Sequence, residues 1–513
     1  MCLLVAAASA QTVPTMGSIS GMVVDSLTGA PMAKCAFRVQ RFRTTTDAQG
    51  RYSIKELAPG RFPVYVSEND FQHQTVKTVT LLAGQDLTVD FRITPVAHIS
   101  GRVLDENKEP VPGVQVWTEW TEYFHGALRQ VVGDDGESDD QGSYTIDAVE
   151  SGHPLVLQAQ KLPATINAIA EAPVEPKLRK LTAIPTYYLD AVNLAAAERL
   201  ILRAGERREA VDIHLRKAPA FCADGVIEGA HPLNFFVSSA CTSTQHGKTG
   251  PDGKFRICNL HPGDCQLRTN QAVGQSVLAY GLAAFTVRDA DIHDLKVPAQ
   301  APISLGGEVL WAGDPPDPPP ANKVMITLRP IGRPFWYSDF AALTTQSPLP
   351  GPFAFSSVLI SDYYVLVTGL TGNQYVKDIT YSGISVLHGS FRAGTAAGNR
   401  GLQVTLASDG AFLNASVADK DGKPVDAYVL AMPANAGSDP ILADSMVSGQ
   451  TDQNGAWRSS ALPPGRYYVL VESGQPKPTP ETITRLRRSQ NRAQEIDLRP
   501  NGAASAKLPA PIE

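Results

Sequence analysis

Two short motifs recur along this chain of 513 residues, and their spacing constrains the fold more than any other feature. In its first copy the closing motif consists of Asp47, Gly50, Tyr52 and then Pro59-Gly60. Four copies keep one interval between two glycines: Gly50 and Gly60, Gly142 and Gly152, Gly253 and Gly263, Gly455 and Gly465. An internal repeat of this kind indicates an array of small structural units rather than one large enzyme domain.

The closing motif has the residues of a β hairpin. The Asp47 side chain can accept hydrogen bonds from backbone amides two residues on, and Gly50 suits the exit from a type I turn. Tyr52 and Ile54 then alternate with polar residues, which is the period of a half-buried strand. The motif therefore predicts a turn followed by a strand.

A second strand follows at residues 62–66, after Pro59-Gly60, the pair favoured in a type II turn. Pro63 lacks an amide donor, so we expect this strand at a sheet edge or with its nitrogen pointing outward.

The opening motif adds a further strand before each hairpin, as in Ser20-Gly21-Met22-Val23-Val24-Asp25 and Ser100-Gly101-Arg102-Val103-Leu104-Asp105. Polar turn residues, a proline and another apolar stretch come next. Several short strands separated by Gly/Pro turns predict a β-sandwich.

Length and repeats together predict an all-β chain built as a tandem array of about five small antiparallel β-sandwich modules of the transthyretin or Ig type. The fourth module diverges, because Gly351 to Phe355 replace the Asp-led turn, and the second carries an insertion around residues 162–203, in which Ala191 to Leu200 suggest a short helix. The expected division is 1–16 (signal peptide remnant and linker), 17–95, 96–217, 218–298, 299–407 and 408–513.

The first residues resemble an export signal. An apolar run from Leu3 to Ala8 ends in Ala8-Ser9-Ala10, a small-x-small cleavage pattern before Gln11. No basic region precedes the run, so we expect either that the natural start lies upstream or that the sequence is truncated. This pattern predicts an exported protein that is periplasmic, cell-surface or extracellular.

Four cysteines, Cys222, Cys241, Cys258 and Cys265, fall in the third module. In an exported chain they predict two disulfides, with three possible connectivities. Zinc is disfavoured, because paired cysteines at zinc sites are usually separated by two to four residues. Cys35 is expected to be a small buried hydrophobe.

Composition argues against several function classes. The net charge of -6 disfavours nucleic acid as a partner, and no stretch approaches the roughly 20 apolar residues that span a bilayer. No nucleophile, zinc-peptidase, phosphate-loop or dinucleotide motif is present. We therefore expect no catalytic residues, cofactor or metal. An enzyme would require histidines and carboxylates converging in a cleft at a module junction.

Residues 133–140 form an acidic loop. A calcium site using Asp134, Asp135, Glu137, Asp139 or Asp140 is one interpretation, but the spacing does not match an EF-hand. We favour a solvated hairpin tip in which Asp139 forms the turn of the repeat.

Aromatic residues gather just before this loop, at Trp117, Trp120, Tyr123 and Phe124. Packing in the core or at a sheet edge is the favoured interpretation, because residues 114–118 alternate as a strand does. Stacking on a sugar ligand is the alternative.

With these residues in view, the chain resembles tandem carboxypeptidase regulatory-like domains, the transthyretin-like modules found beside peptidase domains and in exported bacterial proteins. The resemblance is clearest in Ser20–Asp25, Asp47–Tyr52 and Leu57–Phe62, in Ser100–Asp105 and in Leu462–Tyr467. It implies a non-catalytic module with a carbohydrate-binding-like fold, and it supplies no ligand residues.

The expected function is therefore a non-enzymatic exported protein that serves as a spacer, a carbohydrate-binding-like scaffold or an interaction scaffold, with carbohydrate or a cell-envelope protein as partner. The alternative is an accessory or inhibitory partner of a secreted hydrolase or outer-membrane receptor, bound by strand addition at a sheet edge.

Overall fold

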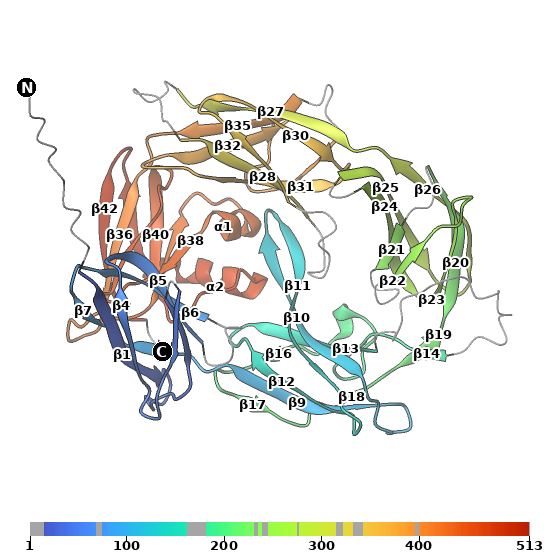
Figure 1. Cartoon of the computed structure of the whole chain (residues 1–513), viewed down its shortest axis with the longest axis horizontal. Coiled ribbons are helices and arrows are strands. Elements are labelled where there is room, and N and C mark those ends of the chain that lie inside the picture. The colour runs from blue at the N-terminus through green and yellow to red at the C-terminus, as the bar shows by residue number, and fades with distance from the viewer. Residues whose placement is uncertain are drawn as a thin grey trace, which may run out of the picture.

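The computed structural model describes residues 15–39, 41–67, 74–161, 181–229, 234–238, 245–273, 276–313, 322–331, 342–394 and 400–511. These residues form a tandem array of β-sandwich modules, so the predicted fold class is confirmed. Figure 1 shows the modules following one another around a ring, with the last module beside the first. The proposed leader lies outside the described residues. No described helix has the length and hydropathy needed to cross a membrane.

The first module sets the pattern for the others. Two sheets enclose a core in which Ile19, Phe37, Val64 and Phe91 are fully buried. One sheet contains β1 (Gly17–Asp25), β4 (Arg51–Leu57), β7 (Asp86–Thr88) and β8 (Phe91–Ile93); the other has the order β3 (Phe42–Thr45), β2 (Ala36–Val39), β5 (Gly60–Ser67) and β6 (Gln74–Leu81).

The second module repeats this plan with longer strands. One sheet contains β9 (Ala97–Leu104), β12 (Ser143–Val149), β17 (Arg207–Arg208) and β18 (Ile213–His214); the other contains β10 (Val114–Phe124), β11 (Ala127–Glu137), β13 (Pro154–Lys161), β15 (Thr186–Tyr187) and β16 (Leu200–Ile201). In its insertion, the alanine-rich segment forms a single 3-10 turn, Leu194–Ala196, instead of the expected short helix. A short pair, β14 (Leu181–Ala183) with β19 (Lys217–Pro219), leads to the third module.

In the third module the two layers join into one seven-stranded path, because β25 also pairs with β26. The order is β22 (Gln245–Lys248), β21 (Asn234–Ser238), β24 (Gly263–Val273), β25 (Ser276–Val287), β26 (Ile292–Gln300), β20 (Phe221–Glu228) and β23 (Lys254–Leu260).

The fourth module keeps the plan despite its divergent sequence, since β30 pairs with β27 as β4 pairs with β1. Its sheets are β30 (Gly351–Val358), β27 (Ile303–Trp311), β35 (Arg400–Ala407), β32 (Tyr375–Tyr381) and β33 (Ile384–Ser385), and β29 (Leu343–Ser347), β28 (Val324–Pro330), β31 (Asp362–Thr368) and β34 (Phe391–Arg392).

The fifth module adds two helices to its sandwich. Its strands are β36 (Phe412–Ala418), β39 (Ala456–Arg458) and β42 (Ala503–Pro509), and β38 (Val447–Gln450), β37 (Tyr428–Pro433), β40 (Gly465–Glu472) and β41 (Gln494–Leu498). The helices α1 (Asp439–Ser445) and α2 (Pro480–Ser489) pack on the second sheet through a separate apolar cluster that includes Leu442, Ile483 and Leu486.

The Asp-led turn forms as the sequence predicts. In the first module, Oδ1 of Asp47 accepts hydrogen bonds from the amides of Gln49 at 2.9 Å and Arg51 at 2.8 Å. Gly50 has a φ of +71°, and a Cβ there would lie 2.5 Å from the carbonyl oxygen of Val23 on β1. The turn therefore requires glycine for its backbone conformation and for its contact with the opening strand.

The type II turn expected before the next strand is wrong, and so is the edge position, which was one of the two options for Pro63. The φ of Gly60 is +151°, whereas a type II turn needs about +80° at that position. Gly60 instead begins β5. That strand is central, lying between β2 and β6, and not at an edge. Pro63 is tolerated because the ladder with β2 reaches only to Val64, one residue later.

The sheets are not purely antiparallel, because the last strand of each module pairs in parallel with the first. In the first module this last strand breaks into β7 and β8 around Val89. The Val89 carbonyl accepts a hydrogen bond from the Tyr52 hydroxyl at 2.6 Å, and a Cβ on Gly21 would lie 2.1 Å from the same oxygen. The opening glycine therefore makes room for the broken strand.

The same arrangement recurs in the second module with Tyr144, Val211 and Gly101. The fifth module has Ala415 and Trp457 at these positions of β36 and β39. There β42 pairs with β36 without a break from residue 412 to 418. The opening glycine and the tyrosine thus accompany a broken last strand.

Polar contacts join neighbouring modules around the ring. Oγ1 of Thr182 and Nε2 of His261 lie 3.4 Å apart between the second and third modules. The Tyr280 hydroxyl accepts a hydrogen bond from the Ile360 amide between the third and fourth. Asn373 donates to the side chain of Asn501 at 2.5 Å between the fourth and fifth. Each of these three junctions therefore has specific partners.

Candidate functional site

The β10–β11 hairpin reaches from the second module toward α1 and the fourth module (Figure 1). It carries all four aromatic residues singled out from the sequence, Trp117, Trp120, Tyr123 and Phe124, and each of them is half-buried. The hairpin is long because β10 and β11 pair over most of their length. It therefore brings the rings toward its tip to a junction of three modules.

The two tryptophans of the hairpin are each bonded to a carboxylate two residues on. The Trp117 indole Nε1 donates to Glu119 at 2.5 Å, and that of Trp120 donates to Glu122 at 3.2 Å. Glu119 also accepts a hydrogen bond from Gln130. Burial raises the pKa of Glu119, although both hydrogen bonds act to lower it. This polar network fixes the ring orientations.

Further contacts cover the Trp120 ring. The ring packs edge to face against His153 at 5.1 Å, and the Lys477 ammonium of the fifth module lies 5.5 Å from its centroid. Lys477 also pairs with Glu150 at 2.9 Å. His153 is only 3% exposed, and burial lowers its pKa. Trp120 therefore packs within a module contact.

Phe124 and its neighbour His125 occupy the hairpin tip. The guanidinium of Arg129 lies 3.6 Å from the Phe124 centroid. Tyr364 of the fourth module packs edge to face on Phe124 at 5.0 Å and stacks on His125 at 4.0 Å. Phe124 thus also packs at a module junction.

His125 and His388 both bind one carboxylate. Nδ1 of His125 lies 3.0 Å from Oδ1 of Asp444, and Nδ1 of His388 lies 2.6 Å from its Oδ2. The side chain of Asp444 is only 14% exposed. Burial opposes its ionisation, but the two imidazoles outweigh burial and lower the pKa of Asp444 to about 2. The sequence did not single out these residues, because they lie far apart in the chain.

Tyr123 belongs to the apolar contact beside this cluster. Its side chain packs against the group that contains Leu442 and Ile483 from the two helices. Its amide donates to the Pro478 carbonyl at 2.8 Å, just before α2. Among the described residues, Trp117 and Tyr123 have no aromatic ring or cation against them, and of these two only Tyr123 packs against an apolar core cluster.

A buried ion pair ties the first module to the fifth. Nζ of Lys77 lies 2.8 Å from Oδ2 of Asp426, and the two side chains are 7% and 14% exposed. Lys77 also donates to the Asp90 carbonyl at 2.8 Å, and Gln450 donates to Asp426 at 2.9 Å. The fifth module is therefore joined to the first, second and fourth.

Histidines and carboxylates do converge at a module junction, which is the arrangement that an enzyme would need. In the described structure, however, no hydroxyl or thiol is hydrogen-bonded to His125 or His388. Across the same residues, no group of three or more His, Cys, Asp or Glu side chains is arranged to hold a metal ion. The cluster is a contact between modules of one chain, with both imidazoles directed at one carboxylate.

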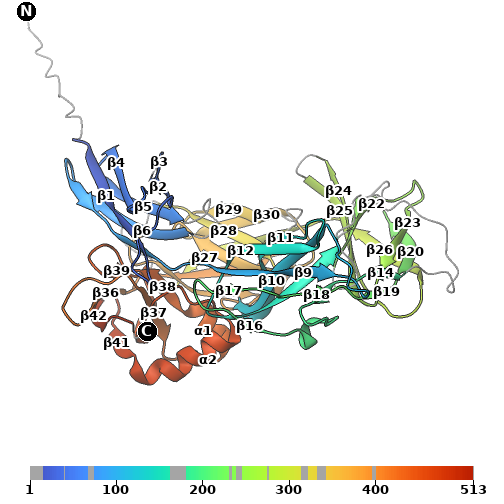
Figure 2. The same cartoon turned by 90° about the horizontal axis from the view of Figure 1, so that it is seen from below.

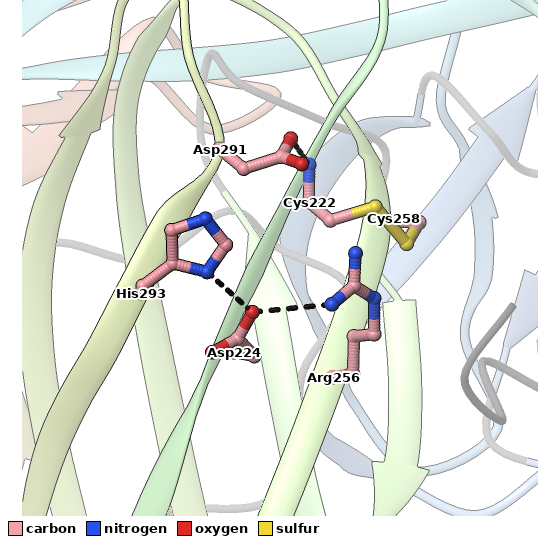
Figure 3. Close-up of a disulfide and its surroundings, with 6 residues drawn as sticks. All are labelled: Cys222, Asp224, Arg256, Cys258, Asp291 and His293. Carbon is pink, nitrogen blue, oxygen red and sulfur yellow. Dashed lines mark hydrogen bonds and ion pairs between the residues drawn. A yellow bond between two sulfur atoms is a disulfide. The ribbon is translucent and has the colours of Figure 1, made fainter. Parts of the chain in front are cut away.

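The third module contains a disulfide between Cys222 on β20 and Cys258 on β23 (Figure 3), with the Cα atoms 4.0 Å apart. This is one of the pairings that the sequence leaves open. Cys265 is also disulfide-bonded, and Cys241 lies outside the described residues. Cys35 is fully buried in the first core.

Asp224 lies beside this disulfide, between an imidazole and a guanidinium group (Figure 3). One of its oxygens is 2.8 Å from Nδ1 of His293 and 3.2 Å from Arg256. The Cys222 amide donates to Asp291 at 2.8 Å. These contacts connect β20, β23 and the start of β26, and so brace the sheet around the disulfide.

The acidic loop separates into strand and turn. Asp134 and Asp135 lie in β11, whereas Oδ1 of Asp139 accepts from the amides of Gln141 at 2.8 Å and Ser143 at 2.9 Å. Asp139 therefore forms the turn of the repeat.

Comparison with known families identifies the first module. Residues 18–94 match the model of the carboxypeptidase regulatory-like domain. The resemblance inferred from the sequence is thereby confirmed for that segment. The matched segment contains both motifs of the first copy and the contacts among Gly21, Tyr52 and Val89. No curated protein matches the chain.

Three solved structures are among those to which the chain is similar. A streptococcal ancillary pilin is 11% identical over 56% of this chain and 99% of its own, with a TM-score of 0.19. The TIE protein of Bacillus anthracis is 11% identical over 93% and 74%, with a TM-score of 0.15. BcpA, the major pilin subunit of Bacillus cereus, is 12% identical over 56% and 99%, with a TM-score of 0.14. Likenesses at this level carry no functional information for this chain.

Proposed function

We propose that the protein is an exported, non-enzymatic scaffold that binds carbohydrate or a cell-envelope protein. The observation that supports this most is that Asp444 binds both His125 of the second module and His388 of the fourth. The side chains best suited to acid–base chemistry are thus engaged with one another across a junction. Holding the modules together explains why these three side chains lie in contact.

The fifth module acts in this proposal as the element that closes the ring. It contacts the first module through Lys77 and Asp426, the second through Tyr123, and the fourth through His388. A closed ring holds its surfaces at fixed positions, which reduces the ordering cost when a partner binds.

The module boundaries near residues 95, 217, 298 and 407 are part of the same proposal. They are supported by the position of the five main apolar cores, which lie within residues 19–93, 97–215, 221–297, 305–406 and 411–508.

Trp117 is the best placed of the four aromatic residues to meet a sugar. Its indole Nε1 is fixed by Glu119, and no ring or cation of the described residues lies against it. An aromatic face held in one orientation can stack on a sugar at low entropic cost. The other three rings serve the module contacts in this proposal.

The test compares the full chain with its Trp117→Ala variant on a glycan array and in a pull-down of envelope proteins. Glycan retention that the variant loses supports the proposal. A stoichiometric protein complex that forms without glycan favours the accessory-partner alternative. Hydrolysis of an ester, amide or phosphoester substrate that His125→Ala abolishes would contradict a non-enzymatic role.

A further inference from the structure

A solvent-open surface lies along the exposed side of α2 and continues over the 3-10 turn that follows it, Gln490–Arg492. Its polar residues include Glu481, Thr484, Arg485, Arg488, Asn491 and Arg492. Figure 2 shows α2 at the edge of the molecule, where a long ligand could approach.

The helical repeat gathers the arginines on this side. Thr482, Ile483 and Leu486 are buried against the fifth module, so positions 485, 488 and 492 face solvent. Residues three and four apart share one face of a helix. Arg485 and Arg488 are three residues apart on α2, and Arg492 follows in the 3-10 turn Gln490–Arg492.

Neighbouring charges leave this surface positive. Arg485 pairs with Glu472 at 2.6 Å, and Arg199 of the second module pairs with Glu481 at 3.1 Å. Within the described part of the chain, no carboxylate lies within salt-bridge distance of Arg488 or Arg492.

Four arginines against two glutamates therefore leave two positive charges on this surface. The whole chain, by contrast, carries a net charge of -6. Arg487 does not add to the surface, because it turns toward Asp439 and bonds to it at 2.5 Å.

We propose that this surface binds a linear acidic glycan with a carboxylate on successive sugars. The planar guanidinium matches a carboxylate with two parallel hydrogen bonds. A line of arginines suits a polymer with repeated charges better than a single small anion. Thr484 and Asn491 offer hydroxyl and amide groups to the sugar hydroxyls. The partner class rests on the proposed scaffold function, but the site is separate from Trp117.

The test measures binding of an oligogalacturonate to the full chain by calorimetry at low salt. Wild type is expected to bind, and Arg488→Gln/Arg492→Gln to lose about tenfold or more in affinity, because both unpaired cations are removed. The matched control, Arg51→Gln/Arg61→Gln, removes two exposed charges from the first module and is expected to bind as wild type does. Added salt should weaken wild-type binding, since exposed charges are screened.

Four results would overturn the inference. These are equal loss in the two double variants, equal binding of a neutral oligosaccharide, tighter binding of a single-stranded oligonucleotide, and displacement of the glycan by equimolar inorganic phosphate. If neutral glycans bind through Trp117 but oligogalacturonate does not bind, this inference fails and the scaffold function stands. If wild type cleaves oligogalacturonate, the non-enzymatic function fails, and the double variant still tests the site.

Discussion

His125, at the tip of the β10–β11 hairpin, bonds through Nδ1 to Oδ1 of Asp444 on α1 at a distance of 3.0 Å. The bond joins the second module to the fifth, which are separated in sequence by two other modules. Because His388 of the fourth module bonds to the other oxygen of Asp444, one carboxylate fixes three modules.

Asp444→Asn should loosen this junction. The amide keeps one acceptor oxygen but loses the charge and one of the two bonds, so we expect a loss of about 2 kcal/mol in the free energy of unfolding. Hydrogen exchange should rise at residues 122–128. Asp421→Asn, in an exposed turn of the same module, is the matched control. Unchanged exchange in the hairpin of the Asp444 variant would show that the carboxylate does not hold it.

The buried pair Lys77–Asp426 makes a second test possible. Lys77→Met leaves Asp426 buried without its cation, and breaking such a pair costs roughly 3–5 kcal/mol. The double variant Lys77→Met/Asp426→Leu removes both charges and should recover most of that loss. Denaturant unfolding of the two variants measures the difference. Equal stability of the double and single variants would argue against a desolvated pair.

Gly101 should tolerate no side chain. A Cβ there would lie 2.1 Å from the Val211 carbonyl oxygen, so Gly101→Ala must displace the broken last strand of the second module. We expect a loss of about 1–3 kcal/mol. Gly437→Ala is the control, because its added Cβ meets no atom within 4 Å.

Tyr144→Phe, which deletes the hydroxyl bonded to Val211, should lower the free energy of unfolding by about 1 kcal/mol. Thermal unfolding of these variants checks all three values.

His153 should make the chain sensitive to mild acid. Burial lowers the pKa of His153 in the folded state, so below its ordinary value of 6.5 the unfolded chain binds more protons than the folded chain. Stability is then lost as pH falls from about 6.5 toward the lowered pKa, and it is retained above that range. His153→Phe should show a shallower loss between pH 7 and pH 5 in chemical denaturation. A parallel profile in the variant would mean that other groups cause the acid sensitivity.

The sequence predicts the hairpins well because their determinants are local. Asp47 and Gly50 fix a turn through contacts that span four residues, and the apolar alternation of β4 follows directly. The edge option for Pro63 was wrong because an edge strand and the end of a strand ladder look alike in sequence. The close approach of Gly21 to Val89 depends on a strand that returns at the end of the module. The sequence motif therefore contains this glycine but does not reveal the contact that requires it.

The junction around Asp444 is harder to predict from the sequence. The aromatic cluster of β10 was visible as a pattern, but its partners, Tyr364 and Asp444, come from modules far along the chain. Neither stands in a motif. Their pairing depends on how the modules are oriented around the ring, which no local pattern encodes.

The modules form a closed ring and do not move independently of one another. The distance between the second and fifth modules reports this arrangement. Spin labels on the exposed positions Leu128 of the hairpin and Ile441 of α1 report the separation of the second and fifth modules. Wild type should give one narrow, short distance distribution, which broadens in Asp444→Asn. A broad, long distribution in wild type, unaffected by that substitution, would contradict the closed ring.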